Sequence, residues 1–292
     1  MTQKLPAVSF PRKLRIQAES VFSRGGSLDS RFRGNDTAGS FWVMTPEETR
    51  ALLLYRDGLM LVLNKPAGVA VHRGPKGGQS LEDDFDALRF GLPRKPALAH
   101  RLDRETSGCL VLGRHHKALE KLGLLFKQGK IAKTYWAIVE GRPDEDEGLI
   151  DLPLGRLDES RGWWMKVDPN GAPAQTRWRV LGHGEQDGQA IAWLALSPLT
   201  GRTHQLRVHC AAKGWPILGD AIYGRAARGA GPPLQLHARR IEIPIAKAKP
   251  PVVVEAPAPA HMRKALIACG FSSDLDVESP TALDRETISA ES

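Results

Sequence analysis

The polar segment 100–108 holds the side chains that are best suited to chemistry. It reads His-Arg-Leu-Asp-Arg-Glu-Thr-Ser-Gly and precedes the short apolar run 109–112, which predicts a loop ahead of a buried strand. Catalytic groups concentrate in loops that a rigid scaffold positions. Asp103 lies between Arg101 and Arg104, and an ionised carboxylate in such a place can act as a nucleophile or as a base. The alternative interpretation is a cluster of surface ion pairs.

A second segment combines a glycine turn with the start of a helix. Gly201 precedes Arg202, and the predicted helix over 203–213 would present this arginine near its N-terminus. Helix N-termini attract phosphate, and a guanidinium adds two parallel donors. His204 and His209 are separated by more than one helical turn, and the glutamate of an HExxH zinc motif is absent. We therefore expect hydrogen-bonding or surface histidines here and no metal site.

The third segment, 133–141, is rich in β-branched and aromatic residues, which predicts a strand over 134–139. Side chains alternate between the two faces of a strand, so Lys133 and Tyr135 share one face. An aromatic ring beside a cation can stack on a nucleobase. The alternative is an ordinary tyrosine whose ring packs in the core.

The rest of the sequence predicts many short strands and few long helices. Beyond the segments above, we expect strands at 59–63, 190–196 and 234–243, a helix start at Thr45, a helix at 115–128, a proline-punctuated edge at 250–259 and a last short helix around 262–269. The order lacks the regular alternation of strand and helix that a doubly wound sheet requires. The fold class is therefore predicted as α+β.

Basic charge is concentrated in the central part of the chain. The net charge is +8 overall, and it divides into +4 for residues 1–43, +9 for 44–271 and −5 for 272–292. We expect a disordered basic N-terminal segment over 1–43, one catalytic domain over 44–271 and an acidic disordered tail over 272–292. A basic domain suits a polyanionic partner such as RNA.

The sequence indicates neither a membrane protein nor a protein stabilised by disulfides. No apolar run approaches the roughly 20 residues that span a bilayer, and the N-terminus lacks the apolar core of a signal peptide. We expect a soluble, cytoplasmic protein with no membrane partner. Cys109, Cys210 and Cys269 are scattered without a CxxC pair, which argues against a disulfide framework or a cysteine zinc site.

Taken together and in this order, the segments resemble the RluA-type family of pseudouridine synthases. The matching residues are Asn64 to Gly68; His100-Arg101-Leu102-Asp103 with Thr106-Ser107-Gly108; Lys133, Tyr135, Ala137, Val139 and Gly141; Gly201 to His209; Gly214, Pro216-Ile217, Gly219-Asp220 and Tyr223-Gly224; and Leu236-His237-Ala238. The resemblance covers about residues 55–245. Residues 1–54 are too short and irregular for the extra basic RNA-binding domain of some members, so the chain is similar to the single-domain ones.

The resemblance implies a mixed, largely antiparallel sheet with a cleft that binds RNA, and isomerisation of uridine to pseudouridine without a cofactor or metal. It implies that Asp103 is the catalytic carboxylate, that Tyr135 packs under the target base and that Arg202 pairs with Asp103. Arg101 is expected to enter the RNA where the flipped uridine left. The residues expected to contact RNA are Arg101, His100, Lys133, Arg207 and Leu236.

Several points stay open at this level. Asp103 attacks the ribose C1′ or removes a ribose proton, and the sequence favours neither. A non-catalytic RNA-binding module is an alternative, although an acid in a basic cleft weakens phosphate contact. A hydrolase that uses Asp103 and His100 is a poorer alternative, because nothing resembles a nucleophile elbow. The RNA is ribosomal or transfer RNA, its binding should depend strongly on salt, and a monomer is expected.

Overall fold

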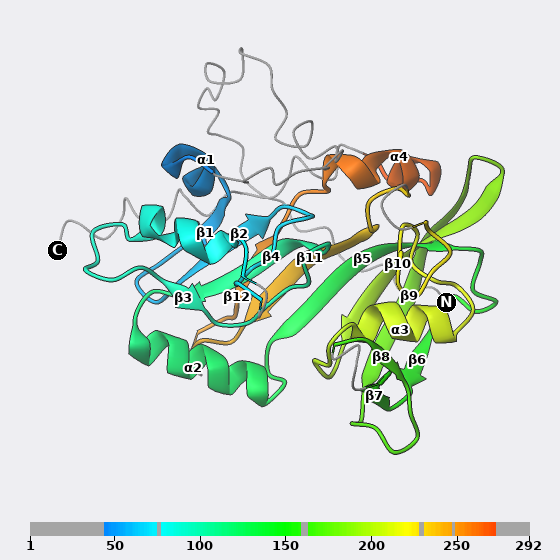
Figure 1. Ribbon diagram of the computed structural model, residues 1–292, viewed down its shortest axis with the longest axis horizontal. Coiled ribbons are helices and arrows are strands. Elements are labelled where there is room, and N and C mark those ends of the chain that lie inside the picture. Colours follow the sequence, from blue (N-terminus) through cyan, green and yellow to red (C-terminus); the bar gives the residue numbers. More distant parts are fainter. Residues whose placement is uncertain (1–43, 75–76, 159–162, 228–230, 247–248, 273–292) are drawn as a thin grey trace, which may run out of the picture. The chain divides into compact units, whose positions relative to one another are not determined.

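The computed structural model describes residues 44–74, 77–158, 163–227, 231–246 and 249–272 (Figure 1). The predicted terminal segments 1–43 and 272–292 lie outside these residues except for Ser272, so the division of the chain into three parts stays a prediction. The predicted helix start at Thr45 is confirmed by α1 (Pro46–Ala51). Thr45 and Glu48 form a capping box, in which each side chain accepts a hydrogen bond from the other residue's backbone N–H.

A ten-stranded sheet forms the centre of the described chain. Its strands are β1 (Leu53–Arg56), β2 (Met60–Lys65), β3 (Ala97–Leu98), β4 (Ser107–Gly113), β5 (Ala132–Glu140), β6 (Glu147–Asp151), β9 (Gln175–Gln186), β10 (Gln189–Pro198), β11 (Leu236–Ile243) and β12 (Val252–Glu255). The order is β1-β2-β4-β11-β5-β10-β9-β6, with β3 beside β4 and β12 beside β11. β4 and β11 are parallel and the other pairs are antiparallel, which confirms the predicted α+β fold with a mixed, largely antiparallel sheet.

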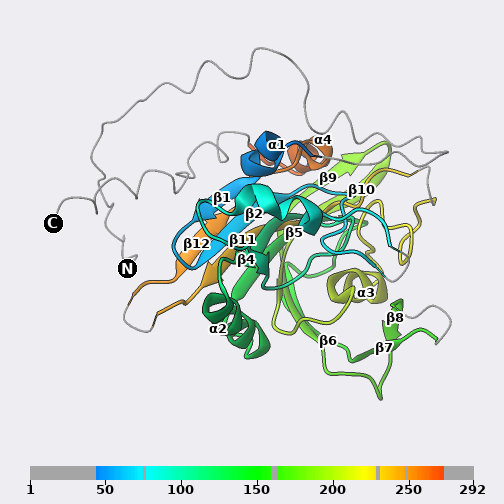
Figure 2. The ribbon, with the colours of Figure 1, turned by 60° about the vertical axis from the view of Figure 1, so that its left-hand side comes forward.

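Helices lie on both faces of the sheet. They are α1, η2 (Leu81–Leu88), α2 (His116–Lys127), α3 (Gln205–Ala212) and α4 (Ala260–Ala268). In two views, α1 and α4 lie on one side of the sheet and α2 and α3 on the other (Figures 1 and 2). A separate hairpin of β7 (Leu154–Arg156) and β8 (Met165–Val167) lies beside α3. No helix in the described ranges is both long and apolar enough to cross a membrane.

Alternate residues of the central strands pack into two different cores. Ala137 of β5 and Leu194 of β10 belong to the core under α3, whereas Ile138 and Trp193 belong to the core under α4. Because both faces are covered, a central strand can bury side chains on both of them, and β4 buries all of its residues. This explains why the predicted strand at 109–112 is an uninterrupted apolar run.

One row of paired residues crosses the four strands that carry the candidate site. Gly108 of β4 pairs with Ala238 of β11, and Ala238 pairs with Tyr135 of β5. Tyr135 pairs in turn with Leu196 of β10. Gly108 has a φ of +103°, and a Cβ there would collide with the backbone oxygen of Ala238, so glycine is required. This row lies at the start of β4 and at the end of β10, so the loop before β4 and the loop after β10 begin near the same row of the sheet, with β11 and β5 between them.

Candidate active site

Asp103 begins a tight turn that leads into β4. The backbone N–H of Thr106 donates to the carbonyl of Asp103 at 3.1 Å, which closes the turn. The side chain of Asp103 keeps 29% exposure, so the carboxylate is accessible while its backbone is held. The predicted placement of this residue in a loop just before a buried strand is confirmed.

The buried side chain of Lys65 binds the backbone of this turn. Lys65 ends β2 with no exposed surface, and its Nζ donates to the carbonyl of Arg104 at 2.9 Å and to that of Pro66 at 2.7 Å. Arg104 donates from Nε to the carbonyl of Gly68 at 2.8 Å, so the two segments bind each other in both directions. Burial lowers the pKa of Lys65 from 10.5 to about 7, although the negative charges of Glu105 and Asp103 oppose the shift.

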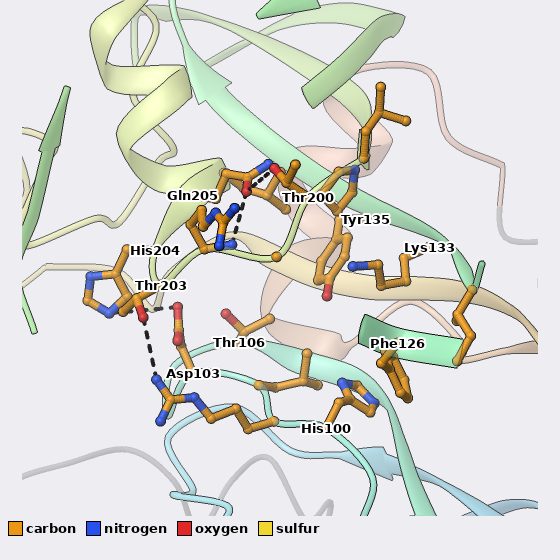
Figure 3. Close-up of a pocket in the computed structure, with 18 of the residues that line it drawn as sticks. His100, Asp103, Thr106, Phe126, Lys133, Tyr135, Thr200, Thr203, His204 and Gln205 are labelled. Atoms are coloured by element: carbon orange, nitrogen blue, oxygen red, sulfur yellow. Dashed lines mark hydrogen bonds and ion pairs between the residues drawn. The ribbon is translucent and has the colours of Figure 1, made fainter. Parts of the chain in front are cut away.

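Tyr135 and Lys133 of β5 line the same cavity, as their alternation predicted (Figure 3). Burial, and then the negative charge of Asp103, raises the pKa of Tyr135 above its ordinary value, so the phenol stays protonated. Leu236 of β11 also lines the cavity, and it pairs with Ala137, which lies two residues after Tyr135 on β5. These strands therefore provide an aromatic and aliphatic wall with a cation at its edge.

The loop after β10 forms the opposite wall, and a buried amide shapes it. Oε1 of Gln205 accepts hydrogen bonds from Thr200 Oγ1 at 2.7 Å and from the backbone N–H of Arg202 at 3.0 Å. Nε2 of Gln205 donates to the carbonyl of Gln175 at 2.9 Å and to Thr176 Oγ1 at 3.0 Å. One side chain thus binds the loop to β9. This glutamine lies inside a segment that the sequence singled out, but its role was not predicted.

The expected pairing of Arg202 with Asp103 is not present. Arg202 is exposed on the cavity wall, and its Nε donates to the carbonyl of Pro173 at 3.0 Å. Among the residues that the structure describes, no ion pair joins Arg202 to Asp103. Instead, Nε2 of His204 faces Oδ2 of Asp103 at 3.8 Å (Figure 3).

His204 is held firmly where it faces Asp103. It precedes α3 with a left-handed φ of +53°, and its side chain is 6% exposed. Its Nδ1 forms a hydrogen bond of 2.7 Å with the hydroxyl of Tyr223. Burial lowers the pKa of His204, and the negative charge of Asp103 opposes that shift. The sequence predicted a hydrogen-bonding or surface histidine at this position; the residue is buried and hydrogen-bonded, and its contact with Asp103 was not predicted.

The cavity between these walls has a volume of about 700 Å³. Its described lining includes one carboxylate, that of Asp103, and five cationic side chains, namely Arg101, Lys127, Lys133, Arg202 and Arg207. Arg101 is exposed and reaches across the opening, where its Nη2 lies 3.5 Å from Thr203 Oγ1. The lining is therefore electropositive around a single acid.

Arg207 lines the cavity and is held by a buried ion pair. Its Nε and Nη2 donate to the two carboxylate oxygens of Asp220 at 2.8 and 2.7 Å, and both side chains are at most 5% exposed. Its guanidinium also lies over the ring of Tyr223, 5.3 Å from the centroid. These contacts fix the direction of the Arg207 side chain in the cavity wall, and the RNA contact expected for it stays a prediction.

His100 holds the loop on the sheet. Its Nε2 accepts a hydrogen bond from the backbone N–H of Val111 at 3.0 Å, and its ring stacks on Phe126 with centroids 4.5 Å apart. Burial, reinforced by the positive charge of Lys133, lowers the pKa of His100 to about 3, so the ring is neutral. An RNA contact by His100 stays a prediction.

The described residues contain no group of three His, Cys, Asp or Glu side chains placed to hold a metal ion. All three cysteines are unpaired and buried. The expectation that no metal or cofactor takes part stays a prediction.

Comparisons with known proteins identify the family. The family model of RNA pseudouridylate synthase matches residues 59–212. An uncharacterised RNA pseudouridine synthase of Zymomonas mobilis is 42% identical over 221 residues, which cover 75% of this chain and 97% of that protein. Ribosomal large subunit pseudouridine synthase C of Vibrio cholerae is 36% identical, covering 75% of this chain and 69% of that protein.

A solved structure, human RNA pseudouridylate synthase domain containing 1, superposes with a TM-score of 0.63 at 30% identity, covering 78% of this chain and 95% of that one. The sequence and the fold thus agree with the family resemblance that the motifs indicated. The chain belongs to the RNA pseudouridylate synthase family, and it converts uridine to pseudouridine in RNA.

Proposed function

We propose that Asp103 is the catalytic carboxylate of this isomerisation and that the cavity receives one uridine from a structured RNA. The supporting observation is that Asp103 is the one carboxylate in the described lining, among several Lys and Arg side chains. An acid at this position weakens phosphate binding. A protein that only bound RNA would have no use for it there, whereas an enzyme needs it.

The proposed reaction balances without a cofactor. Asp103 attacks the ribose C1′ or removes a ribose proton, and the bond between N1 of uracil and C1′ breaks. The uracil turns, and C5 bonds to C1′. As this bond forms, the bond between Asp103 and C1′ breaks, or, in the second route, the ribose regains its proton. C5 loses its hydrogen as a proton while N1 gains one, so no electrons enter or leave.

The base must leave the RNA stack before Asp103 can reach the ribose, and this costs a few kcal/mol. We assign the ring of Tyr135 to the extruded uracil, because it lines the cavity and its neutral phenol adds no charge beside Asp103. Arg101 is exposed at the opening and is suited to fill the space that the uridine leaves. Lys127, Lys133 and Arg202 are assigned to the RNA backbone.

Ribosomal RNA is the first substrate to test, because the Vibrio cholerae relative is named for the large ribosomal subunit. Transfer RNA is the alternative. Both RNA fractions are prepared with tritium at C5 of uridine from cells that lack the gene, and each is incubated with purified protein. Because C5 loses its hydrogen in the reaction, tritium released into water measures turnover.

Asp103→Asn is the test variant, because it keeps the shape of the side chain and removes its charge. Glu105→Gln is the matched control, because it changes an exposed acid of the same turn that is outside the cavity lining. We expect the wild type and Glu105→Gln to release tritium from one fraction, and Asp103→Asn to bind RNA without releasing any. Full activity of Asp103→Asn, or no release by the wild type from either fraction, would contradict the proposal.

A further inference from the structure

We propose that His204 is a positioning residue for Asp103, and that Tyr223 determines which ring nitrogen of His204 carries the proton. This inference rests on the proposed catalytic role of Asp103 and assigns the group that orients it. The arginine expected there, Arg202, is bound to the carbonyl of Pro173. His204 is the side chain that faces the carboxylate (Figure 3).

The ring of His204 is enclosed on several sides. Its edge contacts with Trp163 and Tyr223 have centroid distances of 5.2 and 5.4 Å, and its side chain is 6% exposed. Its left-handed backbone, just before α3, turns the ring away from the helix and toward the loop that carries Asp103. A buried, contacted ring has little freedom to rotate, so the direction of its nitrogens is set by the fold.

Tyr223 selects the tautomer of that ring. The hydroxyl oxygen of Tyr223 accepts a hydrogen bond from the backbone N–H of Met165 at 2.9 Å. Its single hydrogen is then free to be donated to Nδ1 of His204, 2.7 Å away. A neutral imidazole that accepts at Nδ1 carries its proton at Nε2, and Nε2 is the atom that faces Asp103. The opposite tautomer would point a lone pair at a carboxylate.

The buried ion pair behind the cavity holds Tyr223 in place. Oδ1 of Asp220 accepts hydrogen bonds from the backbone N–H groups of Ile222 and Tyr223 at 2.9 and 3.0 Å. Arg207 binds the same carboxylate and covers the tyrosine ring. The buried pair of Arg207 and Asp220 therefore supports a chain of contacts that leads to Asp103.

This arrangement orients one oxygen of Asp103 and leaves the other for the substrate. The separation of 3.8 Å between Nε2 and Oδ2 is longer than a hydrogen bond, and closing it to a bond needs a movement of about 0.9 Å. Catalytic hydrogen bonds are often long in the free enzyme and shorten when substrate binds. We expect this contact to shorten when RNA fills the cavity.

Two substitutions at one position separate the proposal from a purely structural role. His204→Asn tolerates the left-handed backbone and keeps a polar group near Tyr223, but it is too short to reach Asp103. His204→Gln extends an N–H to about the place of Nε2. Tyr223→Phe keeps the ring and removes the hydroxyl that selects the tautomer. His183→Gln, on an exposed residue of β9, is the control.

Single-turnover tritium release and RNA affinity are measured for each variant on the RNA fraction that the wild type modifies. We expect His204→Asn to lower the rate roughly 10- to 100-fold with unchanged RNA affinity, since misplacing a reacting group by about 1 Å costs that much. His204→Gln should recover at least part of the loss, and Tyr223→Phe should lower the rate less than His204→Asn. Thermal melting of each variant confirms that it is folded.

Wild-type rates for His204→Asn would overturn the inference, as would a loss confined to RNA affinity or a His204→Gln rate no better than that of His204→Asn. Should His204→Asn not fold, Tyr223→Phe decides: an unchanged rate contradicts the proposal. Failure of the proposed function itself is distinct, because the wild type would then be inactive or Asp103→Asn active.

Discussion

Replacing Lys65 with methionine should make the stability of the protein less dependent on pH. Lys65 is wholly buried under the turn that carries Asp103, where its ammonium binds two backbone carbonyls. Burial lowers its pKa to about 7 in the folded chain, whereas the unfolded chain keeps the ordinary value of 10.5. Between these values the unfolded chain binds a proton that the folded chain does not. The free energy of unfolding therefore rises with pH across this range.

The size of the effect follows from the two pKa values. Each pH unit in which only the unfolded chain holds the proton adds about 1.4 kcal/mol. From pH 7 to pH 9 the folded lysine passes from half-protonated to neutral, so Lys65 contributes about 2 kcal/mol of added stability over this interval. Methionine has a similar length and no proton to lose, so Lys65→Met should lack this increment.

Urea unfolding at several pH values measures the difference between wild type and Lys65→Met, in which the other titrating groups cancel. We expect this difference to change by about 2 kcal/mol in favour of the wild type between pH 7 and pH 9. Lys264→Met is the control for exchanging lysine for methionine, because Lys264 is exposed and pairs with the exposed Asp187. A flat difference for Lys65→Met would refute the reasoning.

Three further predictions concern packing and charge. Gly108→Ala should lower the free energy of unfolding by about 2–4 kcal/mol in urea unfolding, because it combines a positive φ with a collision against Ala238. The control Gly123→Ala, in an open part of α2, should raise stability slightly. Equal effects of the two substitutions would contradict this prediction. Arg207→Met should lower the free energy of unfolding, measured in the same way, by about 3–5 kcal/mol, because it leaves the buried charge of Asp220 unpaired. A loss below about 1 kcal/mol would show that the ion pair is not needed for stability. RNA affinity should fall roughly 20- to 40-fold between 50 and 200 mM salt in fluorescence anisotropy, as the three phosphate contacts of Lys127, Lys133 and Arg202 require, and unchanged binding would count against the electropositive cavity.

Much of the fold could be predicted because its signals are local. The helix over 115–128 and the strand over 134–139 correspond to α2 and β5, whose boundaries follow from apolar spacing and from β-branched residues. β9 was missed, because Gln175–Gln186 is polar and contains two glycines. Those glycines are needed: a Cβ at Gly182 or Gly184 would collide with the backbone at the end of α4. Such an approach between distant segments leaves no local pattern.

The site shows the same division. Asp103, Tyr135 and Lys133 were predicted to lie in a loop or on one strand face, and the structure brings them to one cavity. The partners of charged residues were predicted poorly. Arg207 binds Asp220, thirteen positions away, and Arg202 binds a backbone carbonyl in place of the expected Asp103. Which cation faces which acid depends on the directions of the side chains. Those directions follow from tertiary packing, so they could not be predicted from the sequence alone.

The most direct test of the central claim uses cells that lack the gene. Their RNA is mapped for pseudouridine at single-nucleotide resolution after complementation with the wild type, with Asp103→Asn or with Glu105→Gln. We predict at least one site that disappears without the gene, returns with the wild type and with Glu105→Gln, and stays absent with Asp103→Asn. A site restored by Asp103→Asn, or no site that depends on the gene, would contradict the assignment of Asp103 as the catalytic carboxylate.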